Sequence, residues 1–270
     1  MNALQKLENQ IKEGNHIAVG LDSDISRIPM HLHNSEDPIL DFNKIIIDNT
    51  FQYAASYKLN FAFYEKDGPA GFETLKKTIE YIPRDKLIIG DAKRGDIGNT
   101  SEMYALSIFN HFQLDSVTLH PYMGFDSVEP FLKYEDKLHF ILALTSNKGS
   151  KDFEKLKLSD DKFLYQKVIE KVHEWNVKKN CGIVFGATNT EELESNINSF
   201  GDLPILLPGI GAQGGSLEEV VNIFNLNKKN NYIINVSRSL IYKDNSEDFG
   251  KAVSEEIKSL HKQISEFSSL

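Results

Sequence analysis

The stretch that decides the fold is Leu87-Ile88-Ile89-Gly90-Asp91-Ala92-Lys93-Arg94-Gly95-Asp96-Ile97-Gly98-Asn99-Thr100. Its apolar start is typical of a buried parallel strand, and charged and glycine residues follow directly before a helical pattern. Because side chains two apart in an extended segment point the same way, Asp91 and Lys93 are expected to share one face at the strand end. Gly95 and Gly98 predict a turn near Asp96. Taken alone, the pattern also fits a simple salt-bridged strand end.

The same order of apolar strand, polar strand end and helix recurs along the chain. The predicted strands lie near residues 16–21, 54–60, 87–89, 116–120, 139–145, 182–186, 203–207 and 232–236. The predicted helices lie near residues 39–52, 71–81, 99–112, 128–134, 163–175, 190–197, 216–224 and 248–267, after a lead-in helix at 3–12. The pairs Asn99/Glu102 and Ser216/Glu219 have the spacing of a capping box.

This alternation predicts an α/β fold, the (β/α)8 TIM barrel. Polar residues follow nearly every strand, as an active face made of strand-to-helix loops requires. A doubly wound open sheet is the alternative. Because no change of composition marks a second domain, residues 1–270 are expected to form a single barrel domain with a short N-terminal lead-in helix.

Composition limits the classes of function. The formal charge of −9 argues against a general nucleic-acid binder, and 26% charged residues are too many for a membrane protein. The start of the chain lacks the apolar core of a signal peptide or an anchor. One cysteine, Cys181, excludes an internal disulfide and fits a reducing compartment. A cytoplasmic enzyme without a nucleic-acid or membrane partner is therefore expected.

The ends of predicted strands seven and eight resemble a phosphate site. In barrels, a phosphate commonly lies between these two loops, on backbone N–H groups at a helix N-terminus. The first loop is the glycine-rich segment 208–215, and the second reads Asn235-Val236-Ser237-Arg238. The glycines alone could simply shape a turn, but Arg238 in the matching loop favours phosphate binding. Gln213 is a candidate to close over the phosphate.

A charged cluster is expected at the opposite strands. Strands one to three end in Asp22, Lys58, Asp91 and Lys93, and Asp96 follows. Such an alternating array keeps its charges ionised, because each has an opposite neighbour. A substrate carboxylate about 4 Å from Asp91 would be repelled by about 4 kcal/mol at an effective dielectric near 20. Loss of CO2 relieves this repulsion, and Lys93 could then stabilise and protonate the carbanion.

Other chemistries use the same residue types. Two carboxylates flanking a lysine could instead hold Mg2+ for an enediolate reaction. A Schiff base ranks third, because it favours a desolvated lysine without two acids beside it. His120 and the other histidines have no second ligand at metal spacing and are interpreted as structural. Asn60 and Ser146, at strand ends two and five, could hydrogen-bond a planar ring.

Together these motifs resemble the orotidine 5′-phosphate decarboxylase family, in its longer bacterial-type and apicomplexan branch. Residues 91–100 resemble its D-x-K-x-x-D-I-x-x-T signature, and segments 120–126, 207–215 and 235–238 resemble the same family. The resemblance runs from strand one to strand eight. It implies a homodimeric (β/α)8 barrel that converts orotidine 5′-phosphate to UMP without a metal or organic cofactor.

The resemblance also implies residue roles. Asp91 crowds the substrate carboxylate, and Lys93 donates the proton to C6. Lys58 bridges Asp91 and the ribose. The implied substrate-binding residues are Asp22 and Asn60 at the ribose, Ser146 at the pyrimidine edge, Gln213, Ser237 and Arg238 at the phosphate, and Asp96, Ile97 and Thr100 reaching the partner subunit's site. Ser237 stands where this family often has glycine, and its backbone N–H serves equally.

Two rival functions remain open. A metal-dependent sugar-phosphate decarboxylase or aldolase of the same superfamily shares the D-x-K-x-x-D element, but it would want an acidic metal ligand after strand two, where this chain has Lys58. A barrel that binds nucleotides without converting them is the non-enzymatic rival. No stretch of the chain suggests an orotate phosphoribosyltransferase domain, so a monofunctional protein is expected.

Overall fold

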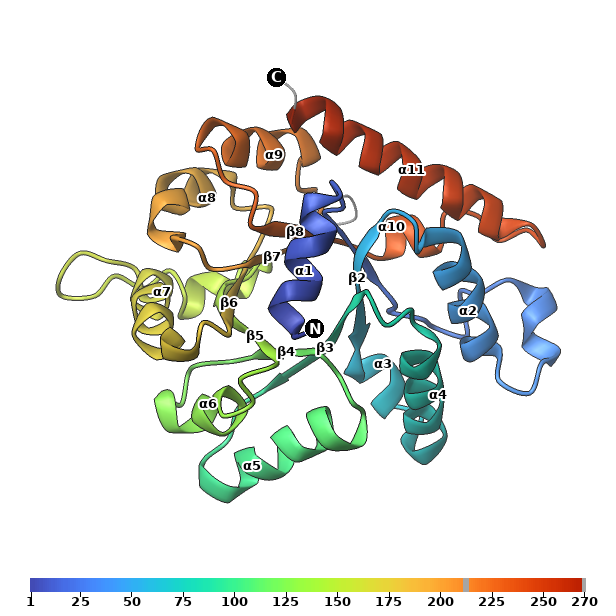
Figure 1. Ribbon diagram of the computed structural model, residues 1–270, viewed down its shortest axis with the longest axis horizontal. Coiled ribbons are helices and arrows are strands. Elements are labelled where there is room, and N and C mark those ends of the chain that lie inside the picture. Colours follow the sequence, from blue (N-terminus) through green and yellow to red (C-terminus); the bar gives the residue numbers. More distant parts are fainter. Residues whose placement is uncertain (211–213, 269–270) are drawn as a thin grey trace.

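Eight parallel strands close into a barrel in chain order in the computed structural model, which describes residues 1–210 and 214–268 (Figure 1). The strands are β1 (Ile17–Gly20), β2 (Ala54–Asn60), β3 (Leu87–Arg94), β4 (Ser116–Leu119), β5 (Leu138–Leu144), β6 (Cys181–Phe185), β7 (Ile205–Pro208) and β8 (Tyr232–Val236). Each strand pairs with the next, and β8 pairs with β1. The predicted (β/α)8 barrel is confirmed, and the open sheet is wrong.

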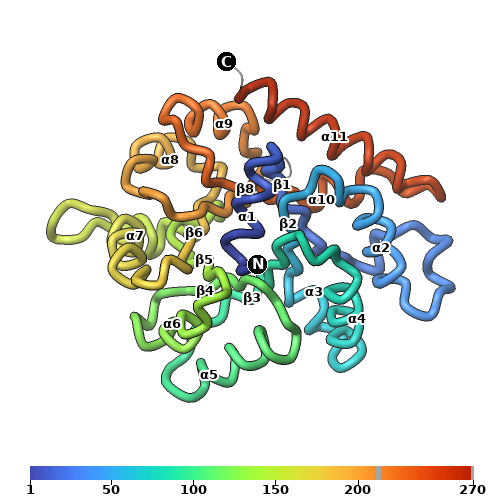
Figure 2. The backbone as a smooth tube through the Cα atoms, viewed as in Figure 1, coloured from blue at the N-terminus to red at the C-terminus, as the bar shows by residue number. Residues whose placement is uncertain are grey.

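Helices surround this barrel on its outside (Figure 2). They are α2 (Pro38–Thr50), α3 (Phe61–Glu65), α4 (Gly68–Tyr81), α5 (Gly98–Leu106), α6 (Phe125–Leu132), α7 (Leu164–Trp175), α8 (Thr190–Asn196), α9 (Leu217–Leu226), α10 (Arg238–Ile241) and α11 (Phe249–Ser268). Helix α1 (Ala3–Lys12) instead lies across one end of the barrel (Figure 1). Its Ala3 and Leu7 pack into the apolar cluster inside the barrel and close that end.

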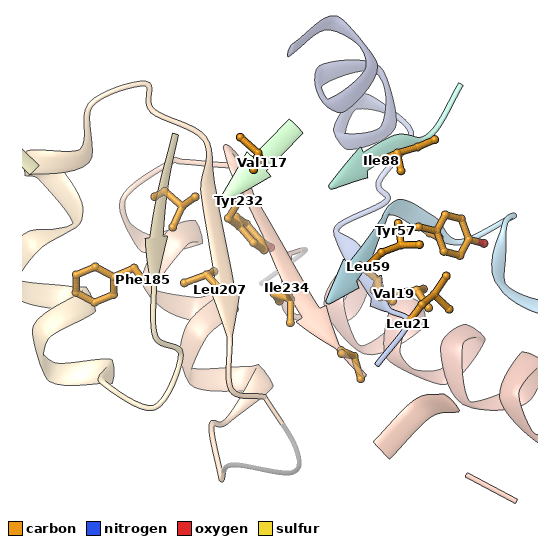
Figure 3. Packing of buried hydrophobic residues seen from close by; sticks show 14 of the residues in the cluster. Val19, Leu21, Tyr57, Leu59, Ile88, Val117, Phe185, Leu207, Tyr232 and Ile234 are labelled. Atoms are coloured by element: carbon orange, nitrogen blue, oxygen red, sulfur yellow. The ribbon is translucent and has the colours of Figure 1, made fainter. Parts of the chain in front are cut away.

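Alternation along the strands produces two apolar cores. Outward residues such as Val19, Tyr57 and Ile234 belong to the cluster that packs the strands against the helices (Figure 3). Inward residues such as Ile89 and Phe140 fill the barrel itself. Because the strand period is two, the polar residues at the C-terminal strand ends face the same inward side as these core residues.

Most predicted elements are present, with local differences. Helix α3 was not expected, because five residues are too few to show a helical period. The Asn99/Glu102 capping box is wrong: α5 begins one residue earlier, after Ile97, and no side chain caps it. Ser216 does cap α9, since its Oγ accepts a hydrogen bond from Glu219 N at 3.2 Å.

None of the helices in the described ranges combines the length and the apolar character needed to cross a bilayer.

Cys181 is buried at the start of β6, and burial raises the pKa of its thiol to about 12. The thiol is therefore protonated at neutral pH and poorly suited to act as a nucleophile.

Candidate active site

A cavity of about 290 Å³ opens at the C-terminal ends of the barrel strands. Its apolar floor comes from Leu142, Val184 and Leu206, which continue the inward set of the barrel core. Its polar wall consists of Asp22, Lys58, Asn60, Asp91, Lys93, Thr118, Thr145, Ser146, Asn147 and Asn235. This is the face on which (β/α)8 barrels carry their active sites, so the cavity is the candidate site.

The predicted charges meet on one side of this cavity. Lys58 Nζ lies 2.8 Å from Asp91 Oδ2 and 3.7 Å from Asp22 Oδ1. Lys93 Nζ lies 2.6 Å from the other Asp91 oxygen, Oδ1. Asp91 therefore stands between two ammonium groups. The salt-bridge interpretation and the catalytic one are both compatible with these contacts, and the location inside the cavity favours the second.

Burial and pairing keep this array ionised. Burial alone raises the pKa of the Asp91 carboxyl, but the charges of Lys58 and Lys93 outweigh it and hold the pKa well below its usual range. Burial lowers the pKa of the Lys58 ammonium, but Asp91 and Asp22 outweigh it and raise the pKa above its ordinary value. Both groups are therefore charged throughout the neutral pH range.

The strand that carries Asp91 and Lys93 is longer and less regular than expected. β3 continues to Arg94, and Gly90 faces Val117 while Arg94 faces Leu119, so four steps of β3 oppose two of β4. This is a β-bulge, a feature that re-aims side chains near active sites. Lys93 within it has φ 47°, a left-handed conformation that is uncommon for a residue with a side chain. The alternation of side chains along the strand therefore predicted that Asp91 and Lys93 come together. It did not predict the backbone conformation that brings them together.

A second, smaller cavity of about 70 Å³ adjoins the first and shares Asp22, Pro208 and Asn235 with it. Ser237 and Arg238 line this second cavity, at the end of β8 and the start of α10. Ser237 Oγ donates a hydrogen bond to Asp22 Oδ2 at 2.8 Å, which links the two cavities. Gln213, the third predicted phosphate residue, lies outside the described residues.

Three predicted site residues do not line the cavity of their own chain. Asp96, Ile97 and Thr100 follow β3 and are absent from the lining contributed by the described residues. Ile97 is 57% exposed. The turn depends on both glycines: Gly98 has φ +53°, and a Cβ on Gly95 would lie 2.8 Å from the His120 carbonyl oxygen. Ile97 and Thr100 are exposed, and Asp96 is half-buried.

Sequence reasoning missed four polar residues of the cavity wall: Thr118, Thr145, Asn147 and Asn235. Thr118 and Asn235 sit at inward positions near the ends of β4 and β8. The period-two pattern could have identified Asn235, because the preceding inward residue of β8, Ile233, belongs to the core inside the barrel, whereas on β4 the residue before Thr118 on the same face is the polar Ser116. Thr145 and Asn147 follow β5 in a loop, where no periodic signal exists.

The chain is similar to known proteins over nearly its whole length. A sequence profile of the Orotidine 5'-phosphate decarboxylase / HUMPS family matches residues 16–253. The orotidine 5'-phosphate decarboxylase of Phocaeicola vulgatus is 47% identical over 267 residues, 98% of each chain. That of Porphyromonas gingivalis is 44% identical over 267 residues, 98% of this chain and 96% of that protein. The structure of Leishmania donovani OMP decarboxylase has a TM-score of 0.81 and 34% identity, covering 97% of this chain and 99% of that chain.

Proposed function

The chain belongs to the orotidine 5′-phosphate decarboxylase / HUMPS family, and from this premise we propose that it is a carboxy-lyase that converts orotidine 5′-phosphate to UMP. The observation that carries the proposal is Asp91 held between Lys58 and Lys93 inside the cavity. A fixed carboxylate beside a cationic proton donor suits loss of CO2 followed by protonation. The metal-dependent rival would want an acidic metal ligand after β2, where this chain has Lys58.

The two adjoining cavities support an orientation for the substrate. The phosphate lies at Ser237 and Arg238, with Gln213 as a further contact, and the pyrimidine lies over the apolar floor. Asp22, Lys58 and Asn60 bind the ribose, and Ser146 meets the pyrimidine edge. Asp91 then crowds the substrate carboxylate, and Lys93 protonates C6 as CO2 leaves. Binding energy at the phosphate offsets the cost of this crowding.

We also propose a homodimer in which Asp96, Ile97 and Thr100 complete the partner's site. These residues do not line their own cavity, and several large apolar side chains of the same half of the chain are exposed. The exposed set comprises Ile97, Met103, Tyr104, Leu106, Tyr122, Met123, Phe125 and Phe153. Tyr122 is 78% exposed and meets Phe153 edge-on at 6.0 Å between ring centroids. Apolar surface of this kind is typical of a subunit interface.

The reaction we propose needs neither a metal nor an organic cofactor. The Lys58 ammonium occupies the space between the Asp22 and Asp91 carboxylates, where a divalent cation would otherwise neutralise them. Within the described ranges, no three His, Cys, Asp or Glu side chains form a group that could hold a metal ion. We further propose that residues 1–270 act as one decarboxylase domain in the cytoplasm.

The purified chain is expected to convert orotidine 5′-phosphate to UMP at the same rate with and without EDTA. The measurement is the loss of substrate absorbance over time, with UMP identified chromatographically. A requirement for added Mg2+ would contradict the cofactor-free proposal and favour the sugar-phosphate rival. UMP binding without any turnover would favour the nucleotide-binding rival.

Replacing Arg238 with alanine is expected to weaken recognition of the phosphate. A lost charge-assisted hydrogen bond is worth about 1.5–3 kcal/mol, so kcat/KM for orotidine 5′-phosphate should fall by about 10- to 100-fold. UMP affinity should fall by a similar factor, while uridine affinity should stay unchanged. An equal loss for uridine and UMP would show that Arg238 does not act on the phosphate. Arg238→Lys keeps the charge, so its kcat/KM and UMP affinity should lie between those of wild type and Arg238→Ala.

A further inference from the structure

The bulge in β3 leaves its main chain facing a side chain of β4. Thr118, which lies between the two paired positions Val117 and Leu119, is 2% exposed and lines the cavity. Lys93 N donates a hydrogen bond to Thr118 Oγ1 at 3.0 Å. A threonine hydroxyl therefore supports the bulge where a regular ladder is interrupted.

The same hydroxyl also holds the acid of the array. Thr118 Oγ1 donates to Asp91 Oδ1 at 2.9 Å. The direction of both bonds is fixed, because an amide can only donate and a carboxylate can only accept. Asp91 Oδ1 also accepts from Lys93 Nζ at 2.6 Å, so Thr118, Asp91 and Lys93 form a closed ring of three hydrogen bonds.

We propose that Thr118 is a positioning residue of the decarboxylation, acting through Asp91 and Lys93 rather than on the substrate. This inference rests on the proposed function. Lys93 adopts φ 47°, and its bond to Thr118 helps to hold that backbone. The same oxygen sets the orientation of the Asp91 carboxylate that crowds the substrate. Without the hydroxyl, both groups are free to move from the geometry that the chemistry needs.

The test compares Thr118→Val, which keeps the volume but removes the hydroxyl, with Thr118→Ser, which keeps the hydroxyl. Thr118→Val should lower kcat by about 10- to 100-fold, because a misplacement of about 1 Å costs roughly that factor. Thr118→Ser should stay within about threefold of wild type, and all variants should bind UMP with affinity within about threefold of wild type. If Thr118→Val does not fold, Thr118→Ala and Thr118→Ser, which differ by one oxygen atom, provide the comparison.

A second measurement needs no substrate. Hydrogen exchange at the Lys93 amide, followed by NMR, should be faster in Thr118→Val than in wild type and unchanged in Thr118→Ser. The proposal would be overturned if Thr118→Val kept the wild-type kcat, or if Thr118→Val and Thr118→Ser lost kcat equally. It would also be overturned if UMP affinity fell in parallel with kcat in Thr118→Val. A wild-type protein without activity would refute the proposed function instead, and unchanged Lys93 exchange in Thr118→Val would then still refute the role of the hydroxyl.

Discussion

Lys93→Ala is expected to lower kcat for orotidine 5′-phosphate by about 10⁴-fold or more, since it removes both the proposed proton donor and a cation beside the developing carbanion. The Lys93 ammonium lies 2.6 Å from Asp91 and is half exposed to the cavity, where C6 of the substrate would lie. UMP affinity should change by less than about tenfold, because the product requires no proton transfer. Steady-state kinetics and UMP titration measure the two quantities.

Two further variants separate charge from proton donation and from folding. Lys93→Arg keeps a cation but cannot release its proton at neutral pH, so it should be almost as inactive as Lys93→Ala. Lys262→Ala, an exposed position on the outer helix α11, should behave as wild type. Because Lys58 still pairs with Asp91, Lys93→Ala should remain folded, which thermal unfolding can verify. Activity of Lys93→Ala within tenfold of wild type would exclude Lys93 as the proton donor.

Much of the site could be predicted because a barrel turns chain order into spatial order. Apolar runs ending in polar residues placed Asp22, Lys58 and Asp91 at neighbouring strand ends, and the structure brings them together. The same rule placed Ser237 and Arg238 beside the glycine-rich loop of β7. These predictions needed only strand period and parallel connection, both of which are properties of local sequence.

The features of the site that could not be predicted depend on contacts between segments distant in sequence. The bulge of β3 arises from its pairing with β4, so nothing in residues 87–94 alone indicates the positive φ of Lys93. Thr118 gains its importance only because that bulge faces it. The expected Asn99/Glu102 cap failed for a local reason: the turn at Gly98 starts α5 one residue earlier, and Asn99 lies inside the helix.

Mixing inactive Asp96→Ala and Lys93→Ala subunits is expected to restore activity, if Asp96 acts across the proposed dimer interface. Asp96 and Ile97 lie outside the cavity lining of their own chain, which motivates the experiment. In a mixed two-fold dimer, the site that keeps Lys93 receives Asp96 from its neighbour and is intact. Random exchange makes about half of the dimers mixed, so the mixture should reach about a quarter of wild-type activity.

The matched control mixes Lys93→Ala with Asp91→Asn. Both residues lie on β3 and contact each other within one chain, so every site of that mixed dimer lacks one of them. No recovery is therefore expected in the control, although subunit exchange proceeds equally and can be followed with differently tagged chains. Recovery in both mixtures would indicate contaminating wild-type protein. Equal inactivity in both, with exchange demonstrated, would contradict the assignment of Asp96 to the partner's site, because the defect of Asp96→Ala would then arise within its own chain.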